Sequence, residues 1–300
     1  MTSPRRSAKA TFRGLGWTGA VLAAALAAAP GQVLAGPTDL FLERTLMSAA
    51  NARCGLFAPD VAAGLAAGAA QARGAVLRAG TDTRAIQALE QRARIEAARI
   101  DCRDPRLTGA AARVRDAFSV YARMARITYP GQVADWRADR GEGRAARWRL
   151  AQTSRFGADR MTFGLAGREG VSALVAVTTF ADGAAPFSAR LILRDPGRTN
   201  GPYLSLGTGG ALSGKLPPRS ATKGFLAEAR SPASADLLPR DVKTGWAFRF
   251  PAAAERELAA LDPREAVAVE FLFPGEQVRT AYLEVGDFAA GQAFLKLAAR

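Results

Sequence analysis

The hydrophobic pattern of this chain changes its period near Trp148, and that change limits the fold more than any other feature. Before Trp148, apolar residues recur about every three or four positions, which is the period of an amphipathic helix. After it, they alternate with polar residues over short segments separated by Gly and Pro, which is typical of antiparallel strands. The sequence therefore predicts an α+β protein, with a helical bundle followed by an antiparallel β-sandwich.

Four helices are expected in the first half, at about 38–57, 61–80, 81–103 and 108–128. Each carries an apolar stripe at helical spacing, and Pro, Gly or Asp residues mark the ends. The first three have similar lengths and short connections, so we expect them to run up, down and up. That arrangement places the C-terminal ends of the first and third helices at the same end of the bundle.

The two cysteines of the chain, Cys54 and Cys102, fall at those two helix ends. We therefore expect a structural disulfide that staples the bundle, which requires an oxidising compartment. The alternative is a redox-active pair, but the Cys-x-x-Cys spacing of such pairs is missing.

Residues 132–147 contain few large apolar residues, several charges and two glycines. We interpret them as a linker between a helical domain at 36–131 and a β domain at 148–300. Trp136 is the exception within this segment. It either docks on one of the two cores or stands exposed as a binding anchor for a partner.

In the second half, alternating patterns predict strands near 161–165, 171–179, 189–193, 246–250, 267–273 and 278–285. Pro274 and Gly275 form a turn between the last two, which predicts an antiparallel hairpin. Two short helices are expected at 251–261 and 288–298. The Gly- and Pro-rich segment 194–219 predicts a long exposed loop.

The order of elements after residue 245 is strand, short helix, strand, strand, Gly286 and closing helix. This order resembles the C-terminal part of invasion-associated locus B-type proteins, which are exported β-sandwich proteins of α-proteobacteria. The resemblance implies an exported sandwich and no particular chemistry. That family usually carries cysteines in its β domain and lacks a helical domain, whereas this β half has no cysteine.

Residues 1–35 have the pattern of a secretory signal peptide. Four basic residues precede an apolar run at 20–29, and small or apolar residues precede a cleavage site between Ala35 and Gly36. The run is too short to span a bilayer, although an uncleaved N-terminal anchor is the alternative. Arg5 and Arg6 leave the twin-arginine route open beside the general secretory route. No later segment predicts a transmembrane helix, so we expect a periplasmic or secreted protein.

The net charge indicates the kind of partner. The leader holds four of the 41 Lys and Arg residues and none of the 27 Asp and Glu residues, so residues 36–300 carry 37 basic and 27 acidic side chains, a formal charge of +10. Candidate partners are envelope proteins or anionic envelope polymers, and nucleic acid is not expected. The alternative is a basic surface without a specific partner, because the arginines are scattered. The sequence leaves the oligomeric state open.

The chain contains no histidine, which excludes the usual Ser-His-Asp and Cys-His nucleophiles and His-ligated metal sites. We expect no cofactor, metal or catalytic residue, and therefore a non-catalytic binding or scaffolding module of the cell envelope. The alternative is a hydrolase that acts on cell-wall or other polymers through paired carboxylates. Its candidate residues are Glu255, Glu257, Asp262, Glu284 and Asp287.

A minor alternative is acyl transfer by Ser220 and Lys223, which fit the Ser-x-x-Lys motif of penicillin-binding proteins. The following Lys-Thr-Gly motif, which starts at Lys243, lies too close in the chain for that fold.

Overall fold

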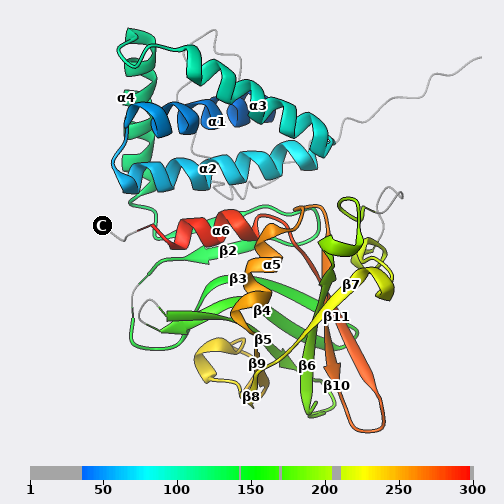
Figure 1. The fold of residues 1–300 in the computed structure, drawn as a ribbon. Helices are drawn as coiled ribbons and strands as arrows, with labels where there is room; N and C mark the ends of the chain where they lie inside the picture. Colours follow the sequence, from blue (N-terminus) through cyan, green and yellow to red (C-terminus); the bar gives the residue numbers. More distant parts are fainter. Residues whose placement is uncertain (1–35, 142, 169–170, 205–210, 298–300) are drawn as a thin grey trace, which may run out of the picture. The chain divides into compact units, whose positions relative to one another are not determined.

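A computed structural model describes residues 36–141, 143–168, 171–204 and 211–297 (Figure 1). The predicted signal peptide, 1–35, lies outside the described residues, so the expected cleavage between Ala35 and Gly36 stays a prediction. The described residues form six α-helices and eleven strands in two antiparallel sheets, which confirms the α+β class. Within these ranges, no helix is both long and apolar enough to cross a membrane.

Four helices come first: α1 (Pro37–Cys54), α2 (Pro59–Arg78), α3 (Thr83–Arg99) and α4 (Pro105–Tyr121). Three of them begin at a proline, whose fixed φ suits the first turn of a helix. Asp82 and Asp104 are the N-cap residues of α3 and α4, because their side chains accept backbone hydrogen bonds at the starts of these helices. Small apolar residues such as Ala50 and Ala97 let the helices approach closely.

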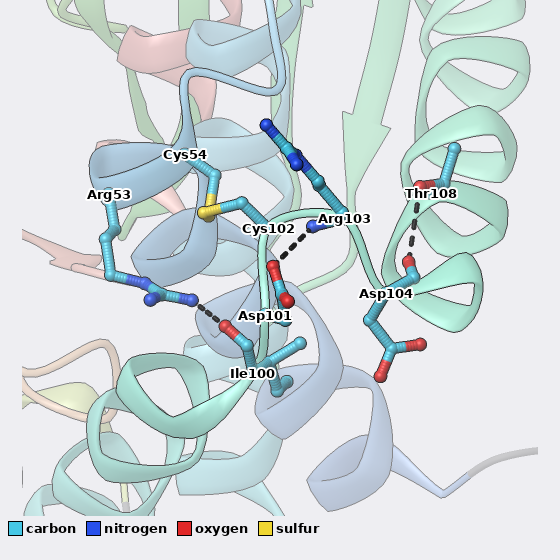
Figure 2. Close-up of a disulfide and its surroundings, with 8 residues drawn as sticks. All are labelled: Arg53, Cys54, Ile100, Asp101, Cys102, Arg103, Asp104 and Thr108. Atoms are coloured by element: carbon cyan, nitrogen blue, oxygen red, sulfur yellow. Dashed lines mark hydrogen bonds between the residues drawn. A yellow bond between two sulfur atoms is a disulfide. The ribbon is translucent and has the colours of Figure 1, made fainter.

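The expected disulfide is present and joins the end of α1 to the turn that follows α3 (Figure 2). The Cα atoms of Cys54 and Cys102 are 5.6 Å apart, which is an ordinary distance for a disulfide. Beside it, Arg53 donates a hydrogen bond to the carbonyl oxygen of Ile100. α1 packs against both α2 and α3, so the disulfide closes one end of this three-helix arrangement.

The seven-stranded sheet, here called sheet A, has the strand order β1-β2-β3-β4-β5-β9-β8. Its strands are β1 (Arg126–Tyr129), β2 (Trp136–Asp139), β3 (Arg147–Phe156), β4 (Asp159–Arg168), β5 (Val171–Thr179), β8 (Ala229–Pro232) and β9 (Trp246–Arg249). The four-stranded sheet, sheet B, has the order β11-β10-β6-β7. Its strands are β6 (Ser188–Arg194), β7 (Thr222–Leu226), β10 (Ala266–Leu272) and β11 (Val278–Glu284).

The predicted linker at 132–147 is wrong where Trp136–Asp139 forms β2, and the fourth helix ends at Tyr121 because Arg126–Tyr129 already forms β1. These two strands pair with each other, and β2 pairs with β3. Both are only four residues long, so their alternation was too brief to be distinguished from a loop. Sheet A therefore begins at Arg126, before the predicted linker starts at residue 132.

One hydrophobic cluster joins the two sheets to the short helices α5 (Ala252–Ala260) and α6 (Phe288–Leu295). Because both sheets contribute to it, their inward faces share a core, while their arrangement as a sandwich stays a prediction. Members of this shared core include Phe163 and Phe248 of sheet A, Leu191 and Phe271 of sheet B, Leu258 of α5 and Phe288 of α6.

α6 contacts α2 on one side and β2 on the other (Figure 1). At the α2 contact, Arg78 donates two hydrogen bonds to Asp287, at 2.8 and 2.7 Å, and the carboxylate side chain is almost fully buried. Gly74 makes room for this ion pair, because a Cβ atom there would lie 2.3 Å from an oxygen of Asp287. Contacts group the described residues into one compact unit.

Candidate binding site on the outer face of sheet A

The outer face of sheet A, opposite the shared core, carries polar side chains on β1 to β4, whereas β5 presents mainly valine residues there. Alternation along each strand produces this face: Leu150 and Gln152 of β3 are buried, whereas Thr153 and Arg155 are exposed. A cavity of about 640 Å³ lies on this face. Its lining includes Arg126 and Thr128 of β1, Arg137 and Asp139 of β2, Trp148, Ala151, Thr153 and Arg155 of β3, Arg160 and Thr162 of β4, Val177 and Thr179 of β5, and Leu237, Leu238 and Pro239.

Two of the four arginines in this lining form ion pairs. Arg126 donates to Asp139 at 2.8 Å across the β1–β2 pair, and Arg160 donates to Asp241 at 2.8 Å. The hydrogen bond from Arg160 is the main cause that lowers the pKa of Asp241, and the positive charge of Arg155 contributes. The positive charges of Arg155 and Arg160 therefore both interact with one carboxylate, that of Asp241.

The other two arginines, Arg137 and Arg155, are exposed, and their guanidinium groups have no hydrogen bond or ion pair with any described residue. Arg155 also lies directly opposite Arg160 in the β3–β4 register. Like charges in directly opposite positions destabilise a sheet, and a bound anion relieves that repulsion. The lining also contains Asp135, so four arginines face the carboxylates of Asp135 and Asp139, with Asp241 paired to Arg160, and a small positive excess remains.

Trp148 reaches this face because of a β-bulge. The β3–β4 register shifts between Trp148 and Leu150, so that Trp148 lies opposite Ala166 and Leu150 opposite Leu165. The extra residue turns Trp148 to the same face as Thr153, although the alternation of β3 alone would place it on the other side. Its indole N–H donates to the carbonyl oxygen of Leu237 at 3.0 Å, which fixes the ring at the cavity wall.

The arginines are spaced along the strand direction. Arg137 lies opposite Ala151 in the β2–β3 register, and Arg155 is four residues farther along β3. At about 3.3 Å per residue, the two arginine positions are separated by roughly 13 Å. Between them, Thr153 and Thr162 lie opposite each other and provide hydroxyl groups. This arrangement can bind an extended ligand that has repeated anionic groups and a flat, partly apolar surface for Trp148.

Trp136, the candidate binding anchor, is instead part of the core, with 1% of its surface exposed. Its indole N–H donates to the carbonyl oxygens of Glu284 and Val285 at 3.2 and 3.0 Å, and its ring packs edge-on against Phe288. The exposed-anchor interpretation is therefore wrong and the docked one holds. The side chain of Trp136 points inward from β2. That direction depends on how β2 pairs with β1 and β3, which the local sequence does not specify.

The buried candidate carboxylates Glu284 and Asp287 are held by structural donors. Glu284 accepts hydrogen bonds from the backbone N–H groups of Gln132, Val133 and Ala134, and so anchors the β1–β2 connection. Burial raises the pKa of Asp287, partly opposed by the hydrogen bonds from Arg78, and the charge of Glu284 raises it further. The two acidic side chains are thus near each other, but both are almost completely inaccessible.

The other three candidate carboxylates each bind a nearby side chain. Glu255 accepts a hydrogen bond from Gln292 at 2.5 Å, and Asp262 accepts two from Arg264, both at 2.9 Å. Glu257 forms an ion pair with Lys223, the lysine of the Ser-x-x-Lys motif. Among the described residues, no group of three or more His, Cys, Asp or Glu side chains is placed to hold a metal ion.

The sequence did not indicate Arg137, Arg155 or Trp148 as binding residues. The residues between Ala151, Thr153 and Arg155 are Gln152 and Ser154, which are polar, so β3 has no clear apolar alternation that would mark an outward face. The sequence could not show that β2 brings Arg137 to this face, or that the bulge turns Trp148 toward it. Both depend on which strands pair and in which register. Comparison of the chain with family models, curated proteins and solved structures found no match.

Proposed function

We propose that the protein is an exported, non-catalytic binding module of the cell envelope that binds an acidic, extended polymer on the outer face of sheet A. The observation that carries this proposal is the cavity in which Arg137 and Arg155 form no ion pair with a described residue and Trp148 forms part of the wall. An acidic glycan fits this chemistry, because its carboxylates match the guanidinium groups and its sugar rings match the indole.

Two features support export to the envelope. The leader pattern at 1–35 is typical of a secretory signal, and the disulfide between Cys54 and Cys102 persists in an oxidising compartment. The C-terminal resemblance to invasion-associated locus B-type proteins is consistent with export. Mass spectrometry of the protein from an envelope fraction is expected to find Gly36 as its N-terminus. A chain that retains residues 1–35 in the cytoplasm would contradict export.

Binding is tested with a linear oligogalacturonate as the acidic polymer and its methyl ester as the uncharged control. The Arg137→Gln/Arg155→Gln variant is expected to bind the acidic form about tenfold or more weakly than wild type, because two charge-assisted contacts are lost. Arg256→Gln is the matched control, since Arg256 is exposed on α5 and does not line the cavity. Binding should weaken as salt rises.

The same experiment separates this proposal from its alternatives. Equal affinity for the acid and its methyl ester, or equal loss in the Arg256→Gln variant, would contradict a specific arginine site. The chain length of the oligomer should stay constant during incubation. Shortening of the oligomer, abolished by Glu255→Gln or Glu257→Gln, would favour the hydrolase alternative.

A further inference from the structure

A second cavity, of about 410 Å³, lies in the helical region between α1, α2 and α4. Its wall is mainly apolar, which is typical of sites for small ligands with hydrocarbon parts. The apolar lining consists of Leu40 and Met47 of α1, Leu65 of α2, and Val114, Ala117, Phe118 and Tyr121 of α4. The polar lining consists of Glu43, Arg44, Gln71 and Arg113.

Arg44 is the unusual member of this lining. Its guanidinium donates to the backbone carbonyl oxygen of Gly68 at 2.6 Å and forms no ion pair with any described carboxylate. Burial lowers the pKa of Arg44, with Glu43 and Tyr121 opposing, so the cation has lost part of its hydration. A cation in that state is stabilised by a bound anion.

A third cavity, of about 580 Å³, shares Leu40, Arg44 and Gln71 with the second. It continues along α1 and α2 toward Pro37 and Gln132. Arg44 therefore lines both cavities, and its guanidinium group donates to the backbone of α2 at Gly68. Arg113, exposed at the far edge of the second cavity, adds positive charge that offsets Glu43.

We propose that the groove between α1, α2 and α4 binds a single-chain anionic amphiphile, such as a long-chain fatty acid, with its carboxylate at Arg44 and its hydrocarbon chain against Leu40, Met47 and Val114. Charge complementarity decides between occupants, because a neutral or cationic amphiphile leaves the half-buried guanidinium without a counter-ion. This site is separate from the arginine cavity of sheet A and does not depend on the function proposed for it.

The test measures fluorescence of dansyl-labelled undecanoate on titration with the protein. Saturable binding is expected, with displacement by dodecanoate and little displacement by dodecyltrimethylammonium, which has the same chain and the opposite charge. Arg44→Gln is expected to weaken binding by roughly 10- to 100-fold, the effect of losing a hydrogen bond to a charged group. Ala117→Trp should block the groove, and because Ala117 is exposed, this variant is expected to fold.

Arg123→Gln is the matched control, since it removes one exposed charge near the end of α4 without altering the cavity lining. Circular dichroism verifies the helix content of each variant. Three results would overturn the proposal: no saturable binding to wild type, equal displacement by both competitors, or unchanged affinity in both Arg44→Gln and Ala117→Trp. The Arg137→Gln/Arg155→Gln variant should bind the probe as wild type does, which keeps the two proposals distinguishable.

Discussion

Removal of the disulfide is expected to destabilise the protein by about 4 kcal/mol. The bond between Cys54 and Cys102 closes a loop with a sequence separation of 48 residues. In the chain-entropy model, a loop of this length restricts the unfolded chain enough to account for about 4 kcal/mol at 25 °C. Cys54 also packs against the cluster around Met47 and Ala50, so the Cys54→Ala/Cys102→Ala variant is used to keep an apolar contact there.

The assay is equilibrium unfolding in guanidinium chloride, followed by circular dichroism, on the oxidised protein, the reduced wild type and the double alanine variant. Reduced wild type and variant should lose the same free energy, because both lose the same loop constraint. In the reduced wild type and the variant, native-state hydrogen exchange should be faster in α1 and α3 than in β4 and β10. The reason is that the loop closed by the disulfide lies within the helices. A loss below about 1 kcal/mol would refute the entropic reasoning, as would a clear difference between reduced wild type and variant.

Two further predictions concern single side chains. Trp136→Ala should lower the unfolding free energy by about 3–5 kcal/mol in the same denaturation assay, because it leaves a cavity at a buried site. The affinity for oligogalacturonate should stay unchanged. A fully stable variant that no longer binds would instead support the interpretation of Trp136 as a binding anchor. Arg279 donates to Asp182 at 2.5 Å, and this hydrogen bond is the main cause that lowers the pKa of Asp182 to about 2. Since that pKa lies below the unfolded value of about 3.9, the stabilisation is present above that value and disappears as the pH falls toward about 2. In Arg279→Gln, carboxyl NMR titration should return the pKa toward its ordinary range; an unchanged pKa would show that Arg279 is not the cause.

Much of the fold could be predicted because it depends on local patterns. The long helices α2 and α3 have apolar stripes, α1, α2 and α3 have proline or aspartate starts, and the disulfide followed from the similar lengths and short connections of these helices. The hairpin of β10 and β11 had a strong turn signal at Pro274 and Gly275. In contrast, β1 and β2 are short, and their identity as strands comes from pairing with distant segments rather than from their own composition.

The site was less predictable than the fold for the same reason. The outward direction of Arg155 had little local signal, because Gln152 and Ser154 of β3 are polar, and nothing local showed that Arg137 would join it. The bulge at Trp148 reverses the face that alternation predicts, and it is visible only in the register with β4. Arg44 was hidden in a helical pattern, where a single basic residue at the edge of an apolar stripe ordinarily points to solvent.

Binding of an acidic polymer to the outer face of sheet A can be followed through the tryptophan indole signals in an NMR titration with oligogalacturonate. Trp148 lines the cavity, whereas Trp136 lies in the core on the opposite face. We predict that the indole N–H signal of Trp148 shifts saturably with the acidic oligomer and not with its methyl ester, while that of Trp136 stays in place. Tight binding of the oligomer with an unchanged Trp148 signal would place the ligand elsewhere and exclude the outer face of sheet A as its site.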